Sequence, residues 1–176
     1  MILLRAFRLV HAVVLTMMLC AAASAQSASN LPHVTLNADN LGPRPIEQVT
    51  GANIARNYAV AWEALTKALE QNRAALLKEQ FIGFAKDRLT QRIADQTRTG
   101  IHVRVVDQGH RLKAVFYSLD GAAMQLIDEA QIQTQVYDGS KLIYSDTAPH
   151  QYLVLMTPGA DRWYVRSLES SPSSTP

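Results

Sequence analysis

The feature that most constrains the fold is the β-rich stretch His110–Tyr137, HRLKAVFYSLDGAAMQLIDEAQIQTQVY. Apolar and polar side chains alternate on both sides of Asp120-Gly121, and both residues of that pair tolerate a positive φ. Such a pair is typical of a hairpin turn between two strands. We therefore interpret the stretch as the middle of a curved antiparallel sheet.

Further strands flank this hairpin. A two-residue turn at Gln108-Gly109 would align strands 101–107 and 110–117 so that their apolar side chains share one face. That face is predicted to carry Ile101, Val103, Val105, Leu112, Ala114 and Phe116. Later strands are predicted at 122–137, 141–145, 152–157 and 163–168, with a turn at Pro158-Gly159.

Apolar side chains at spacings of three and four predict helices before the sheet. They are Ile54, Tyr58, Ala61, Trp62, Leu65 and Leu69, and then Leu76, Leu77, Phe81, Phe84, Leu89 and Ile93. A single helix over 53–97 would be about 65 Å long, which exceeds a compact domain of this size. We expect a break at 71–73 and a stop at Gly100. The predicted class is α+β, with N-terminal helices packed on a curved antiparallel β-sheet in a cone-like meander.

The first 25 residues have the pattern of a signal peptide. Arg5 and Arg8 precede an apolar run, and Ala23-Ser24-Ala25 fits the small-x-small pattern before a cleavage point, so the mature chain would begin near Gln26. The run is short for a bilayer span of about 20 residues, although an uncleaved anchor is the alternative. We expect an exported protein, periplasmic or extracellular, without a membrane span after cleavage.

Composition narrows the function classes. Loss of the two signal arginines lowers Lys+Arg from 17 to 15, which equals the 15 Asp+Glu, so no basic surface for nucleic acid is expected. Cys20, the only cysteine, leaves with the signal, and no metal site or cofactor motif is recognised. About 150 residues suffice for a single core. We expect a flexible linker at 26–46, in which 34–36 could add an edge strand, one domain at 47–169, and a disordered tail at 170–176.

Four segments carry a family resemblance: Tyr58–Trp62, Phe81–Ala85, Phe116–Gly121 and Arg162–Arg166. With the order of helices and strands, they resemble the cystatin-like cone of the nuclear-transport-factor-2-like superfamily over 47–169. They also resemble an uncharacterised family of exported bacterial proteins. The superfamily includes ketosteroid-isomerase-like and polyketide-cyclase-like enzymes as well as non-catalytic partner-binding domains, so the resemblance implies a fold and not an activity.

Asp128 is the candidate catalytic residue, because it shares the parity of the apolar face of its strand. A buried carboxylate has a raised pKa and can act as a general base. Its position depends on the turn before it. A two-residue turn places Lys113 opposite Asp128 as an ion pair, which is the favoured structural interpretation. A three-residue loop places Ala114 there and leaves Asp128 inside.

Two functional hypotheses follow. The first is an exported non-catalytic domain that binds a protein partner or a small apolar ligand, with homodimerisation left open. The second is a cofactor-free isomerase- or cyclase-like enzyme in which Asp128 is the general base. The predicted ligand-binding residues are Tyr58, Trp62, Phe81, Phe116 and Leu126.

Overall fold

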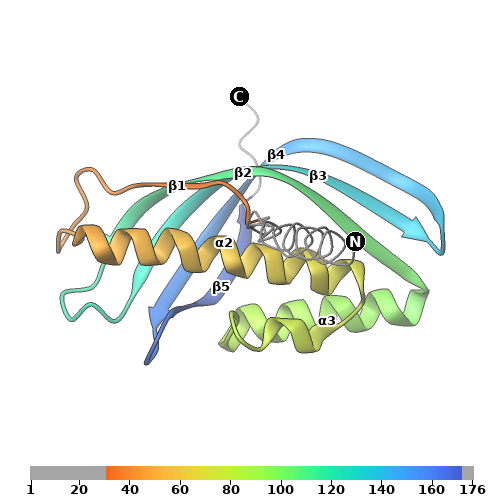
Figure 1. The fold of residues 1–176 in the computed structure, drawn as a ribbon, viewed down its shortest axis with the longest axis horizontal. Coiled ribbons are helices and arrows are strands. Elements are labelled where there is room, and N and C mark those ends of the chain that lie inside the picture. The colour runs from red at the N-terminus through yellow and green to blue at the C-terminus, as the bar shows by residue number, and fades with distance from the viewer. Residues whose placement is uncertain (1–30, 172–176) are drawn as a thin grey trace, which may run out of the picture.

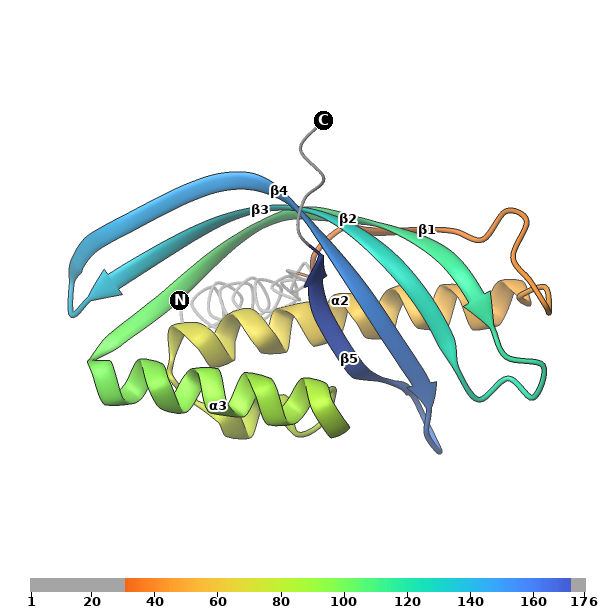
Figure 2. The same ribbon diagram turned by 180° about the vertical axis from the view of Figure 1, so that it is seen from behind.

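The computed structural model describes residues 31–171, which form one sheet arched over helices (Figures 1 and 2). The elements are β1 (Val34–Asn37), α2 (Gln48–Glu70), the 3-10 helix η1 (Ala74–Leu77), α3 (Gly83–Thr99), β2 (Ile101–Tyr117), β3 (Met124–Asp138), β4 (Lys141–Pro158) and β5 (Trp163–Ser171). The predicted signal segment lies outside the described residues, as do residues 172–176 of the predicted tail. The α+β class is confirmed.

The sheet has the order β1-β2-β3-β4-β5, and β2 to β5 pair antiparallel as predicted. The edge strand β1 pairs parallel to β2, with Val34 beside His110. The segment predicted as linker thus contains the edge strand that the sequence allowed at 34–36, and this strand extends to Asn37. Its pattern is short, and β1 is stabilised because β2 offers it backbone partners.

The predicted turn at Gln108-Gly109 is wrong, because β2 is one continuous strand with a bulge between Asp107 and Gly109. The bulge adds one residue to β2, so the side chains after it face the same side that the predicted turn would have given them. The inward face predicted for 101–114 is therefore the one observed. A second bulge between Ala114 and Phe116 changes the parity again. Phe116 is therefore on the outer face, 40 % exposed, and Tyr117 is buried in its place.

The hairpin at Asp120-Gly121 is confirmed, with a loop over 118–123 in place of a two-residue turn. Gly121 has a positive φ of 74°, and the Asp120 carboxylate accepts hydrogen bonds from Ser118 and from the Ala122 amide. The strands predicted at 141–145 and 152–157 are one long strand, β4. The tail begins later than predicted, because β5 continues to Ser171.

The break in the helical region is also confirmed, since α2 ends at Glu70. Asn72 has a φ of 51°, and its side-chain amide donates a 2.7 Å hydrogen bond to the carbonyl of Ile101. The second helix is shorter than predicted: Phe81 forms a bridge to Val165 of β5, and α3 starts at Gly83. Gly100 ends α3 with a φ of 74°, as expected for a left-handed C-terminal cap.

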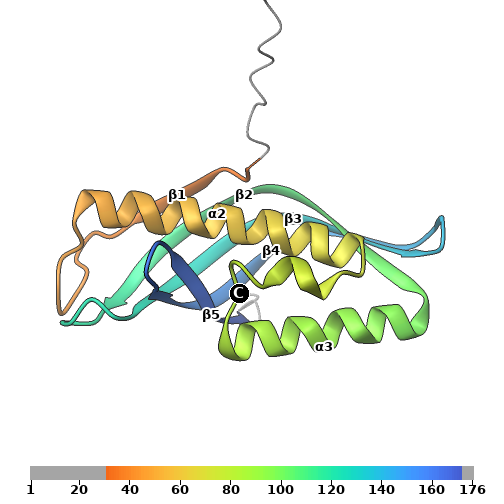
Figure 3. The same ribbon diagram turned by 60° about the horizontal axis from the view of Figure 1, so that its bottom comes forward.

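The core lies between α2 and the concave face of the sheet (Figure 3). The helix α2 contributes Ile54, Tyr58, Ala61, Trp62, Leu65, Ala68 and Leu69 to it. None of the helices within residues 31–171 is long and apolar enough to cross a bilayer.

Candidate functional site

A chain of polar side chains lies buried in this core. The imidazole of His110 bridges two carboxylates: its Nδ1 is 2.8 Å from Asp128 Oδ2, and its Nε2 is 2.8 Å from Asp107 Oδ2. The hydroxyl of Tyr58 donates a 2.8 Å hydrogen bond to the same Asp128 Oδ2. Asp128 is fully buried and His110 is 2 % exposed. The Tyr58–Asp128–His110–Asp107 network therefore has no direct access to solvent at His110 or Asp128.

The bulge in β2 assembles this network. Asp107 and His110 are three residues apart and would point to opposite faces of a regular strand, but the bulge between them turns both inward. The Gly109 amide donates a 2.8 Å hydrogen bond to Asp107 Oδ1, which fixes that carboxylate. The backbone of His110 is held by the residue before β1, since the His110 amide donates to the carbonyl of His33 at 2.9 Å.

The register of β3 places Asp128 opposite Leu112, which neither predicted turn length gives. The favoured ion pair between Asp128 and Lys113 is wrong, because Lys113 pairs with Ile127 in the ladder. Tyr117 still pairs with Met124, as a two-residue turn would give, so the second bulge of β2, between Ala114 and Phe116, accounts for the shift. Asp128 is on the interior face, as the alternative placed it.

Burial alone would lower the pKa of His110, but the hydrogen bonds and charges of Asp107 and Asp128 outweigh it and raise the pKa to about 9. The imidazole is thus a cation between two carboxylates at neutral pH. Burial, followed by the Asp128 charge, raises the pKa of Tyr58 well above its usual value. The pKa of Tyr152 is also raised, mainly by burial, although the charge of Arg92 opposes the shift.

Two buried polar atoms near the network have no hydrogen-bond partner, Asp128 Oδ1 and Trp62 Nε1. The indole of Trp62 packs on His110 with ring centroids 4.5 Å apart, and Tyr152 packs edge-on against the same indole with centroids 5.5 Å apart. Both imidazole nitrogens of His110 are taken by carboxylates. Within 31–171, no group of three or more His, Cys, Asp or Glu side chains is arranged to hold a metal ion.

An apolar cavity of about 160 Å³ lies beside this network, between α2, α3 and the sheet. Its apolar wall consists of Trp62, Leu65, Leu69, Leu89, Val105, Ile132, Tyr152 and Leu168. Arg92 lies on this wall and also borders a wider groove of about 560 Å³ between α3 and the strands β2 and β3. Asp128 and His110 are absent from both linings, so Trp62 and Tyr152 stand between the polar network and the cavity.

The structure brings together only some of the residues predicted for the site. Tyr58, Trp62 and Asp128 meet in the network, and Trp62 reaches the cavity. Leu126 and Phe81 are buried in the core, Leu126 beside Ala114 and Phe81 against β5. Phe116 lies on the opposite side of the sheet and does not contribute.

Sequence reasoning missed Asp107 and His110 as members of the site. Their separation of three residues across Gly109 was the available signal, because a glycine inside a strand pattern often marks a bulge. A bulge there would have placed both side chains on the face that carries Asp128.

Comparisons with solved structures identify the fold. The intermembrane space region of the chloroplast protein ARC6 is similar to this chain with a TM-score of 0.61, at 16 % identity, over 74 % of this chain and 100 % of that one. ActVI-ORFA from Streptomyces coelicolor has a TM-score of 0.49 and 12 % identity, and a candidate dehydratase of the NTF2-like family from Streptomyces avermitilis has 0.46 and 10 %. Each of these two covers 70 % of this chain and 97 % of its own.

The likeness to the ARC6 region shows that the chain shares its fold, in which helices pack on a curved sheet. The resemblance to nuclear-transport-factor-2-like proteins stays a prediction from the sequence. At identities below 25 % the likeness concerns the fold and leaves the activity open. No protein-family model matches the sequence, and the comparison with curated proteins gives no match.

Proposed function

We propose that the chain is an exported, non-catalytic domain that binds a small apolar ligand in the cavity between α2, α3 and the sheet. The single observation that carries this proposal is the cavity wall, in which aromatic and aliphatic side chains dominate and the polar groups are few. Small-molecule sites typically have this composition. An apolar cavity of about 150 Å³ is large enough to hold benzene, so a single small ring fits the volume here.

The enzyme alternative, with Asp128 as general base, has less support. A general base must come within about 3 Å of the proton that it removes, directly or through one water molecule. Asp128 is fully buried, its Oδ2 already accepts two hydrogen bonds, and it does not line the cavity. These observations favour a role for the network in holding β2, β3 and α2 together.

Export is supported by the sequence alone, through the two arginines, the apolar run and the Ala23-Ser24-Ala25 pattern. A domain outside the cytoplasm meets small molecules of its surroundings directly. An apolar cavity of this kind suits a carrier or sensor of such molecules.

Toluene provides a test, with methyl NMR shifts of Leu65 and Leu89 as the readout. We expect saturable shifts in the native protein. Val105→Phe should fill the cavity and weaken toluene binding at least tenfold, because Val105 lines its wall. Val106→Phe is the matched control, since Val106 is the next residue of β2 and is 40 % exposed on the outer face.

The proposal fails if toluene causes no saturable shift in the native protein, or if Val105→Phe binds toluene as the control does. A thermal unfolding curve of each variant shows whether it is folded. If Val105→Phe does not fold, Leu89→Phe replaces it, because Leu89 of α3 lines the same cavity. Leu65 then serves as the NMR readout.

A further inference from the structure

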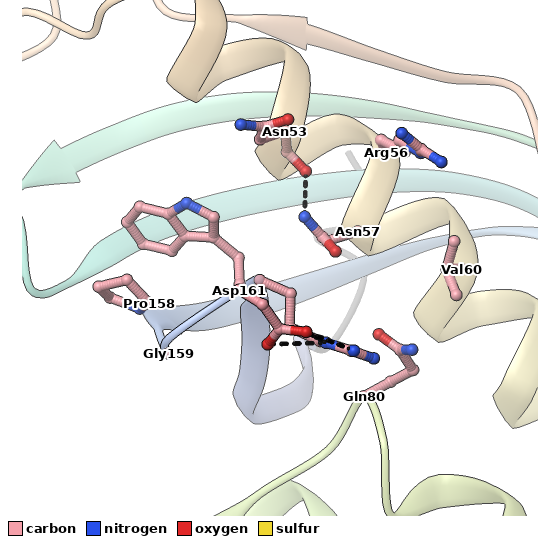
Figure 4. Close-up of a pocket in the computed structure, with 10 residues that line it drawn as sticks. Asn53, Arg56, Asn57, Val60, Gln80, Pro158, Gly159 and Asp161 are labelled. Carbon is pink, nitrogen blue, oxygen red and sulfur yellow. Dashed lines mark hydrogen bonds and ion pairs between the residues drawn. The ribbon is translucent and has the colours of Figure 1, made fainter.

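A second and more polar pocket lies apart from the apolar cavity (Figure 4). It is formed by the first half of α2, the segment before α3 and the β4–β5 turn. Its volume is about 470 Å³, within the usual range of small-molecule sites, and it shares no lining residue with the apolar cavity. Asn57 and Val60 of α2 face Gln80 across it (Figure 4). The turn contributes Asp161, Arg162 and Trp163.

Gln80 is the feature that points to a ligand. The residue is only 7 % exposed, and its Oε1 is buried without a hydrogen-bond partner. Leaving a buried acceptor unpaired costs about 1–3 kcal/mol, so such groups are rare in folded proteins. The Gln80 backbone is held on both sides, because its carbonyl accepts from Val165 at 2.9 Å and its amide donates to Leu77 at 3.1 Å. The backbone thus fixes Gln80 at the pocket, while the Oε1 of its side chain still lacks a hydrogen-bond donor.

The charged side chains of the pocket indicate a second group that the ligand should carry. Arg162 is paired with Asp161, with 2.6 Å between Nη2 and Oδ2, and its Nη1 also lies 4.0 Å from Glu79 Oε2, so its charge is already balanced. Arg56 is exposed at the pocket and makes no ion pair or side-chain hydrogen bond with any residue of the described chain. Its guanidinium is thus a cation of the pocket lining without a carboxylate partner among the described residues, and guanidinium groups bind carboxylates with two parallel hydrogen bonds.

We infer that this pocket binds a small carboxylate that also carries a hydroxyl or amide hydrogen-bond donor. The carboxylate pairs with Arg56, and the donor satisfies Gln80 Oε1. Sugar acids and N-acylated amino acids share this chemistry, and both occur outside the cytoplasm in free and polymeric form. The inference is independent of the ligand proposed for the apolar cavity.

Three probes test the inference by amide NMR titration of the purified protein: D-glucuronate, N-acetylglycine and uncharged D-glucose. We expect saturable shifts around Gln80 and Asn57 with one or both carboxylates, and at least tenfold weaker binding of glucose. Binding of glucuronate assigns the site to sugar acids, and binding of N-acetylglycine assigns it to acylated amino acids. The inference is overturned if neither carboxylate saturates, or if glucose binds as well as glucuronate.

Variants separate the two recognition elements. Arg56→Gln and Gln80→Met should each weaken the bound probe at least tenfold, whereas the exposed and remote Arg73→Gln should bind normally. Without ligand, Gln80→Met should unfold at the same temperature as the native protein or higher, because it removes an unpaired polar atom. A large loss of stability in Gln80→Met, or unchanged affinity in both pocket variants, would show that the amide has a structural role and contradict the inference.

Discussion

At the scale of single residues, the unusual feature is a histidine held as a cation in the core by Asp107 and Asp128. Such a group binds its proton more tightly in the folded protein than in the unfolded chain, where the histidine pKa is about 6.5. Stability is therefore linked to the protonation of His110.

Stability should fall as pH rises from 6.5 to 9. The folded pKa of about 9 is above the unfolded value, so the stabilisation is fully present below pH 6.5 and is lost as pH rises through 9. The shift corresponds to about 3 kcal/mol at most. Urea unfolding at several pH values measures it, with Asp107→Asn as comparison.

Asp107→Asn keeps the size of the side chain and removes one of the two charges on His110. The variant should show a clearly shallower loss of stability over the same pH range, since its His110 pKa is lower. The surface histidines are common to both proteins and cancel in the comparison. Identical pH profiles would mean that His110 is not the group responsible.

At the scale of elements, the bulge of β2 is the feature on which the network depends. Gly109 has a φ of 127°, a conformation that side chains rarely adopt, and a Cβ there would meet the carbonyl oxygen of His33 at 3.2 Å. Glycine is required at this position both for its backbone and for the close approach of the chain before β1.

Gly109→Ala should lower the free energy of unfolding by about 2–3 kcal/mol, through backbone strain and the contact with His33. Gly139→Ala is the matched control, because Gly139 also has a positive φ, 56°, but has no atom near its added Cβ. The control should lose only about 1 kcal/mol. Chemical denaturation measures both values.

The NMR titration of His110 adds a second readout. In Gly109→Ala the bulge is disturbed, so the His110 pKa should fall from about 9 towards 6.5, whereas Gly139→Ala should leave it unchanged. Equal effects of the two substitutions on stability and on the His110 pKa would contradict the importance of the bulge.

At the scale of the whole molecule, the binding proposals assume that the domain works outside the cytoplasm. Protein isolated from its own host should begin near Gln26, as N-terminal sequencing or intact mass would show. Ala25→Leu should block cleavage because a small residue is needed before the cut, whereas Ala22→Leu should be processed normally. An intact N-terminus in the native protein would favour the uncleaved anchor.

The sequence by itself determined the parts of the fold that local periodicity encodes. The spacing of Tyr58 and Trp62 predicts α2, the polar interval at 71–73 predicts its end, and Gly100 predicts the end of α3. Each of these signals is contained within a few turns of one segment, and helix formation depends mainly on near neighbours.

Only the tertiary structure decided which side chains meet in the core. Asp128 lies opposite Leu112 because the bulge between Ala114 and Phe116 sets the register of β2 against β3. Asp107 faces the same side as His110 because the bulge before Gly109 changes the parity of the strand. The strand β1 exists only beside β2. Strand pairing joins residues that are distant in the chain, and a shift of one residue exchanges the two faces of a strand. Apart from Gly109, which signals the first bulge, no local pattern carries that information, so the complete site could not be predicted from the sequence alone.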